Sequence, residues 1–138
     1  MRSHLHSRTR VERGAAAVEF GLISIVLLAL LIGIIQFAIF FWAYEVSAHA
    51  AREGARLGAV DPCNTGAITA LAENRLPNNL GAAATVTPPP SPVEVGKELT
   101  VSVRLDTLDT GFFPGFPSEV SKSATTRIEH VPFGSCTP

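Results

Sequence analysis

Few residues of this sequence have the type and spacing that chemistry requires. Asp109-Thr110-Gly111 spells the triplet of aspartic proteases, in which two aspartates share a proton. The sequence holds no second copy, and the Gly- and Pro-rich surroundings favour a turn. His4 and His6 are candidate metal ligands, but they lack a third ligand nearby. Because no Gly-rich phosphate loop, metal-spaced Cys/His cluster or nucleophile motif occurs, we predict a non-enzymatic chain without metal or cofactor.

Glu19 is a more informative candidate, because this carboxylate stands directly before the longest apolar run of the chain. The run, Phe20 to Tyr44, is 25 residues long and has no charge. As a helix it spans roughly 37 Å, enough to cross a hydrocarbon core of about 30 Å. A carboxylate carried to the bilayer centre would cost about 2.5–3.5 kcal/mol. Glu19 therefore either lies at the membrane surface or is compensated by a cation.

Such a cation arises if a peptidase cuts after Gly14. Ala15 would then carry a free, positively charged amine, and Glu19 would be the fifth residue of the mature chain. In a helical stack of subunits, Glu19 of one subunit can pair with the Ala15 amine of a neighbour, so that each charge compensates the other in an apolar interior. Residues 1–14 would be a disposable leader. Its basic residues are Arg2, Arg8, Arg10 and Arg13.

These residues resemble a known processing site. A short basic leader, Gly14, four residues, Glu19, the aromatic Phe20 and a membrane run together resemble the N-terminus of type IV prepilins, and the Gly-Ala-Ala-Ala-Val-Glu-Phe form is similar to the tight-adherence (Flp-type) branch. The later stretch His49-Ala-Ala-Arg-Glu-Gly-Ala-Arg56 resembles the TadE-like family of pilus-assembly proteins. The resemblance covers residues 10–60. It implies processing between Gly14 and Ala15.

The resemblance also implies a function and a set of partners. The expected function is that of a minor pilin or pseudopilin in the assembly of a tight-adherence type IV pilus, which serves adhesion and surface attachment. The expected partners are the membrane, other pilins, the pilus assembly machinery and prepilin peptidase. A nucleic-acid partner is not expected, because the net charge is −1 and no basic stripe follows residue 13.

Two alternatives stay open. Ala48-His49-Ala50 has the A-x-A pattern of an ordinary signal-peptidase site. However, the apolar run is longer than a signal peptide's core of about 7–15 residues, and it ends in an aromatic stretch, residues 41–44, that is typical of a membrane interface. The second alternative is a single-span envelope protein whose disulfide-bonded head binds a partner or ligand without polymerising.

Basic residues predict the orientation. Four arginines precede the run, whereas only Arg52 and Arg56 follow it closely. The positive-inside rule therefore favours a cytoplasmic N-terminus, with residues 45–138 outside the cytoplasm. Together with the resemblance, this predicts a single-pass protein of the bacterial inner membrane; retention there and entry into an extracellular pilus both stay open.

The helix is expected to continue beyond the membrane, because no proline occurs before Pro62. Its last turns carry a row of small side chains that lets another backbone approach closely. The row serves either another subunit or the protein's own head, and the cost of about 1 kcal/mol for a glycine in a helix interior favours the first. The other side is polar, and there Glu53 is within reach of Arg56. The small residues of this row are Ala51, Gly54, Ala55 and Gly58.

We predict an α+β, pilin-like fold with three parts: a leader (1–14), a long helix (15–60, transmembrane at about 20–44) and a small head (61–138). The head should contain a short helix and a three-stranded antiparallel sheet, because apolar periodicity and alternation mark such elements. The helix is expected at 65–76. The strands are expected at 83–87, 99–105 and 121–131.

Cysteines and aromatics complete the expectations for the head. Cys63 and Cys136 bracket it and are the only two cysteines, so an oxidising exterior would let them form a disulfide; two free thiols are the alternative. Phe112, Phe113 and Phe116 either fill the core against the long helix or form an apolar contact for a partner.

Overall fold

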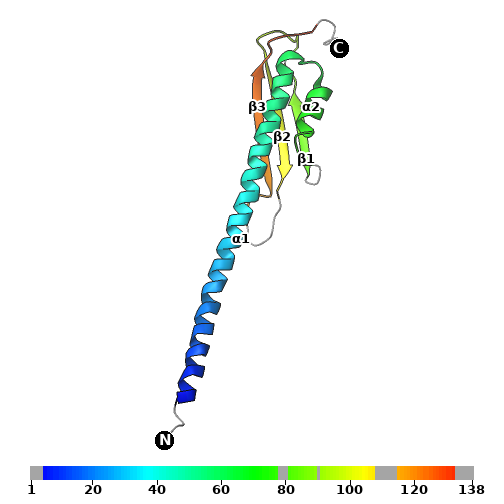
Figure 1. Ribbon diagram of the computed structural model, residues 1–138. Coiled ribbons are helices and arrows are strands. Elements are labelled where there is room, and N and C mark those ends of the chain that lie inside the picture. The colour runs from blue at the N-terminus through cyan, green and yellow to red at the C-terminus, as the bar shows by residue number, and fades with distance from the viewer. Residues whose placement is uncertain (1–4, 78–80, 90, 108–114, 133–138) are drawn as a thin grey trace. The chain divides into compact units, whose positions relative to one another are not determined.

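The chain forms two compact units. The computed structural model describes residues 5–77, 81–89, 91–107 and 115–132, with the backbone alone for residues 5–13. The first unit is Met1–Phe37 and the second is Ala38–Pro138. One helix, α1 (Leu5–Val60), contributes residues to both units (Figure 1).

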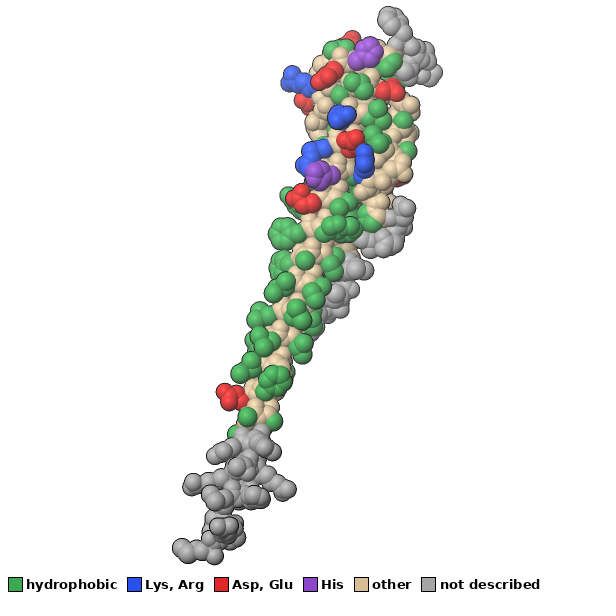
Figure 2. All heavy atoms as spheres, viewed as in Figure 1, with side chains coloured by type: hydrophobic (Ala, Val, Ile, Leu, Met, Phe, Trp, Pro, Cys, Tyr) green, Lys and Arg blue, Asp and Glu red, His purple; other side chains and the backbone are tan. Residues whose placement is uncertain are grey.

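In the first unit, α1 presents large apolar side chains to its surroundings on every side. Its leucines, isoleucines and valines between Val18 and Ile35 are mostly half or more exposed, and Figure 2 shows them along the helix. The hydroxyl of Ser24 donates a hydrogen bond to the carbonyl oxygen of Gly21, at 2.9 Å. Among the described helices, this is the one long and apolar enough to cross a membrane. A helix that is apolar all round requires an apolar environment.

The first turns of α1 correct one expectation. The long helix is predicted to begin at residue 15, after the leader, whereas α1 begins at Leu5. Arginine is a good helix former, and the segment contains no proline, so nothing in it opposes helix. At the other end the prediction is confirmed, because α1 ends at Val60, just before Asp61-Pro62.

The head forms the predicted α+β arrangement of a short helix and a three-stranded antiparallel sheet. The strand order is β1-β2-β3, and the register places Val101 of β2 between Val86 and Ala124. The side chain of Asn64 accepts a hydrogen bond from the Ala67 N–H and so caps the short helix. The elements are α2 (Thr65–Glu73), β1 (Ala82–Thr87), β2 (Glu98–Asp106) and β3 (Glu119–Arg127).

The core lies between one face of the sheet and the two helices. Alternation along β2 buries every second residue, and these side chains meet small residues of α1 and the apolar face of α2. Such alternation is the signature of a strand with one covered face. The buried members include Leu99, Val101 and Val103 of β2, Ala50, Ala51 and Ala55 of α1, and Ile68 and Ala72 of α2.

A second apolar cluster, the base cluster, lies where α1 first meets the head. Ala43 is fully buried with Leu105 and Val120, and Phe40 packs against them. The ring of Phe40 also meets the ring of Phe116 edge to face, with 5.5 Å between centroids. The predicted membrane segment, about residues 20–44, therefore overlaps with residues that the head already covers.

Candidate functional site

The residues of the expected processing site lie together on exposed turns of α1, in the first unit. All side chains from Ala15 to Phe20 are exposed, and Phe20 is 71% exposed. A Cβ added at Gly14 would meet nothing within 4 Å. Glu19 makes no ion pair with any described residue. The residues on both sides of the Gly14–Ala15 bond and the Glu19 carboxylate are thus exposed in this unit.

The row of small residues on α1 packs against the protein's own head, whereas the sequence favours packing against another subunit. Ala51, Gly54, Ala55 and Gly58 are all buried, and the head of the same chain covers them. A Cβ at Gly54 would lie 3.1 Å from Val101 Cγ1 and 3.3 Å from the Cβ of Ala72. At Gly58 it would lie 2.7 Å from Leu99 Cδ2. The structure thus selects packing on the protein's own head, and the row is not a free surface for another subunit.

The opposite face of α1 is exposed and polar, as expected. It carries Glu45, His49, Arg52 and Arg56, all exposed, and Figure 2 shows this face with its charged side chains. One pairing differs from the prediction. The Glu53 carboxylate lies 3.6 Å from Arg75, which follows α2, so that its partner comes from the neighbouring element and not from Arg56 on its own helix.

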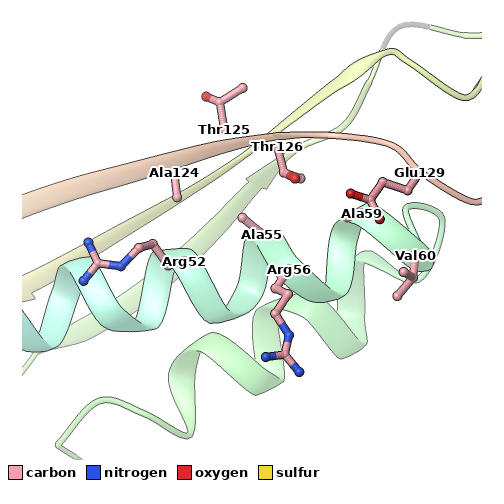
Figure 3. Close-up of a pocket in the computed structure, with 9 residues that line it drawn as sticks. All are labelled: Arg52, Ala55, Arg56, Ala59, Val60, Ala124, Thr125, Thr126 and Glu129. Atoms are coloured by element: carbon pink, nitrogen blue, oxygen red, sulfur yellow. The ribbon is translucent and has the colours of Figure 1, made fainter.

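Two hollows flank this polar face. The larger, about 550 Å³, lies between α1 and β3, and its lining includes the small side chains of Ala55, Ala59 and Ala124 (Figure 3). Figure 3 shows Arg52 and Arg56 on its helix side and Glu129 at one end. The smaller, about 330 Å³, is lined by Val46, His49, Glu53 and Arg75.

Several expected residues fall outside the described part of the chain. Asp109, Phe112, Phe113 and Cys136 lie there, as do the side chains of His4 and His6. The Cys63–Cys136 disulfide therefore stays a prediction. Phe116 lies in the described part, is half buried and packs on Phe40. Of the two roles expected for these phenylalanines, core packing and partner contact, Phe116 has the first. Within the described residues, no group of three or more His, Cys, Asp or Glu could hold a metal ion.

One contact was missed by the sequence reasoning. The Nζ of Lys122 lies 3.4 Å from the centroid of the Tyr44 ring, a cation–π contact between β3 and α1. The alternation along β3 could have indicated that Lys122 faces α1. Lys122 shares the inward row of β3 with Val120 and Ala124, so alternation places a charged side chain on the covered face.

Comparison with known protein families finds a match in the N-terminal segment. Residues 14–56 match the family model described as TadE-like protein. The segment is TadE-like. The match confirms the predicted resemblance, begins at Gly14 of the expected processing site and ends in the polar turns of α1. It covers less than half of the chain and leaves the head outside. No curated protein and no solved structure matches the chain.

The TadE-like match associates this chain with the tight-adherence pilus system. With the exposed apolar helix, it also indicates a membrane-anchored, single-pass protein. The candidate site is therefore a surface of α1, with Gly14 and Glu19 at the edge of the apolar run.

Proposed function

We propose that this chain is a minor pilin or pseudopilin that takes part in assembling a tight-adherence type IV pilus. The observation that carries the proposal is the TadE-like match over residues 14–56, which starts at Gly14 and includes Glu19 and the whole apolar run. The chain would be made as a prepilin, inserted in the inner membrane, and cut after Gly14 by prepilin peptidase.

The exposed carboxylate supports an assembly role. Glu19 is exposed, and no cation of the described residues pairs with it. In a filament whose core is made of apolar helices, an unpaired carboxylate would be costly, and the new Ala15 amine of a neighbouring subunit would compensate it. The partners in this proposal are other pilins and the assembly machinery, and no catalytic step by this chain is required.

The orientation belongs to the same proposal. The arginines before the apolar run outnumber those directly after it, so the N-terminus would be cytoplasmic and the head extracytoplasmic. The head would then fold in a compartment where Cys63 and Cys136 can be oxidised.

A second candidate function is a single-span envelope protein that binds a partner through its head and does not polymerise. One observation favours it. The small residues Ala51, Gly54, Ala55 and Gly58 are covered by the head, so they offer no close-packing surface to another subunit. A filament would have to be built through the exposed apolar part of α1 instead.

One experiment separates the two. The intact mass of the protein extracted from membranes is measured, and purified pili are tested for the chain with an antibody to the head. Loss of residues 1–14 together with presence in pili supports the pilin. Loss of the leader without presence in pili supports a processed assembly factor in the membrane. An N-terminus at Met1 excludes prepilin processing, and one at Ala51 indicates ordinary secretion.

A further inference from the structure

We infer that Lys122 and Tyr44 form a binding site for the phosphate of an anionic lipid headgroup, which seats the head on the bilayer surface. The proposal concerns the membrane that holds α1 and does not depend on a role in pili. Lys122 lies in β3, and Tyr44 is the last residue of the apolar run of α1.

The first support is the unusual place of Lys122. It is half buried in the inward row of an edge strand, between Val120, which belongs to the base cluster, and Ala124. Its ammonium lies against the Tyr44 ring, and no carboxylate of the described residues pairs with it. A half-buried cation without an anionic partner can still accept one.

The second support is the level of this contact along α1. The base cluster begins at Phe40, and Gln36, one turn earlier, is already buried, whereas the neighbouring Phe37 is 55% exposed. We place the end of the hydrocarbon within this stretch of α1, near Ile39. Tyr44 follows it by five residues, or about 7 Å of helix. A headgroup layer is about 5–8 Å thick on each side of the hydrocarbon core. If the hydrocarbon ends near Ile39, the Lys122 ammonium lies at the level of the lipid phosphates.

The third support is the surrounding surface. Phe41 and Trp42 are 61% and 47% exposed, and Tyr44 is 39% exposed, so an aromatic belt lies directly beside the lysine. Aromatic rings of this kind are enriched at membrane interfaces, where lysine side chains extend their amines toward the headgroups. Tyr44 would orient the ammonium, and the phosphate oxygens would accept its hydrogen bonds.

Acidic residues near the site make lipid composition a sensitive test. Glu45 is exposed next to Tyr44, whereas Glu119, at the start of β3, lies 3.0 Å from Arg104 and is thereby compensated. If the charge of Glu45 dominated the electrostatic potential of this surface, an anionic bilayer would repel the head. If Lys122 binds a headgroup, an anionic bilayer would cover the lysine.

The chain contains two lysines, and the second serves as an internal control. Lys97 is exposed at the far end of β2, and its carbonyl oxygen accepts a hydrogen bond from the Ile128 N–H. Lys122 lies opposite Val103 in the register, so Lys97 is about 20 Å farther along the sheet. Acylation of the two amines can be read separately by peptide mass spectrometry.

The full chain is placed in nanodiscs of phosphatidylcholine, or of the same lipid with phosphatidylglycerol, and labelled with an amine-reactive ester. We expect the Lys122:Lys97 labelling ratio to fall about threefold to fivefold in the anionic nanodiscs, since an anionic surface favours each nearby lysine by about that factor. Inorganic phosphate added to phosphatidylcholine nanodiscs should leave the ratio unchanged, which separates a lipid headgroup from a free anion.

Two variants refine the result. Tyr44→Phe keeps the ring and should keep the effect of lipid composition, whereas Tyr44→Leu should reduce it, with circular dichroism verifying the fold of both. A ratio that is equal in the two nanodiscs would overturn the proposal and leave Lys122 with an intramolecular role only. A ratio that rises in the anionic nanodiscs would show that Glu45 and its neighbours repel the bilayer.

Discussion

At the scale of single residues, two glycines decide how closely the head approaches α1. Gly58 faces Leu99 and Gly54 faces Val101, both in the fully buried row of β2. A side chain at either place would occupy space that the core already fills. The cost of a glycine in a helix interior, about 1 kcal/mol, is therefore offset by tight packing inside one chain.

Replacement of Gly58 by leucine should destabilise the head. The new Cβ alone would come within 2.7 Å of Leu99 Cδ2, so the β2 side chain must move, and we expect a loss of about 1–3 kcal/mol in the free energy of unfolding. Thermal unfolding in detergent, followed by near-ultraviolet circular dichroism, measures it.

The matched control is Gly66→Leu in α2, where an added Cβ meets nothing within 4 Å. That variant should be as stable as the wild type or gain up to about 1 kcal/mol from helix propensity. Equal stability of the two leucine variants would contradict the close packing of Gly58.

Glu19 makes a different residue-scale prediction. Glu19→Ala should leave removal of residues 1–14 intact but reduce incorporation into pili more than about tenfold, because the Ala15 amine of a neighbour would lose its counter-charge in an apolar core. Quantitative immunoblots of purified pili and of membranes measure both steps. Glu45→Ala, which removes an exposed carboxylate of the same helix beyond the run, is the control and should assemble normally. Normal assembly of Glu19→Ala would reject the charge pair.

At the scale of elements, the sequence predicts the strands well and the limits of α1 less well. The alternation Leu99 to Leu105 predicts β2 because one face of the strand is covered, and the structure extends it by one residue at each end. The start of α1 could not be predicted in the same way. Leu5 follows neither a proline nor a recognisable cap, so the leader carries no signal that separates it from the helix.

The same limit applies to contacts between elements. Alternation places Lys122 on the inward face of β3, but no local pattern states that Tyr44, far earlier in the chain, supplies the ring that it meets. Likewise, a row of small residues looks the same in sequence whether a partner or the protein's own sheet covers it. For Ala51 and Gly54 only the tertiary packing decides.

The base cluster sets the upper end of the membrane segment. Because Gln36 is already buried and the base cluster begins at Phe40, the segment left for lipid ends between these residues. Residues 20–39 as a helix span about 30 Å, the thickness of a hydrocarbon core. Trp42, the only tryptophan of the chain, should then lie just outside the hydrocarbon.

Fluorescence quenching by brominated lipids tests this placement. We expect Trp42 to be quenched most by bromine near the headgroups, and a tryptophan introduced by Leu30→Trp, in a Trp42→Phe background, to be quenched most by bromine near the chain ends. Strongest quenching of Trp42 by bromine near the chain ends would show that the membrane segment continues past the base cluster.

At the scale of the whole molecule, the predicted disulfide would join the residue just after α1 to the end of the chain. Cys63 follows Pro62, where α1 has ended, and the loop that a bond to Cys136 would close contains the whole head. In the chain-entropy model, a loop of that length stabilises by about 4–5 kcal/mol, and measured values are often smaller.

Thiol alkylation checks this bond. Protein extracted without reductant should take up no iodoacetamide label, and protein reduced first should take up two, as read from the intact mass. The Cys63→Ser variant should lose up to about 4 kcal/mol of stability. A label on both cysteines without prior reduction would contradict the disulfide, and a Cys63→Ser variant as stable as the wild type would show that the bond does not hold the head.

The segments that cover the end of α1 are synthesised well after α1 itself, which affects the order of membrane insertion and folding. The N–H groups of Glu129 and His130 both donate to the carbonyl oxygen of Ala59, and β2, which covers the small residues of α1, begins only at Glu98. At about 5–20 residues per second, β2 is synthesised roughly 2–8 s after the end of α1. The alanine and glycine face is thus made well before its cover, and the apolar run has left the ribosome before the head can close. Insertion of the apolar run into the bilayer is therefore expected to precede folding of the head. During this interval the alanine and glycine face is uncovered, so a translocation factor could bind and shield it.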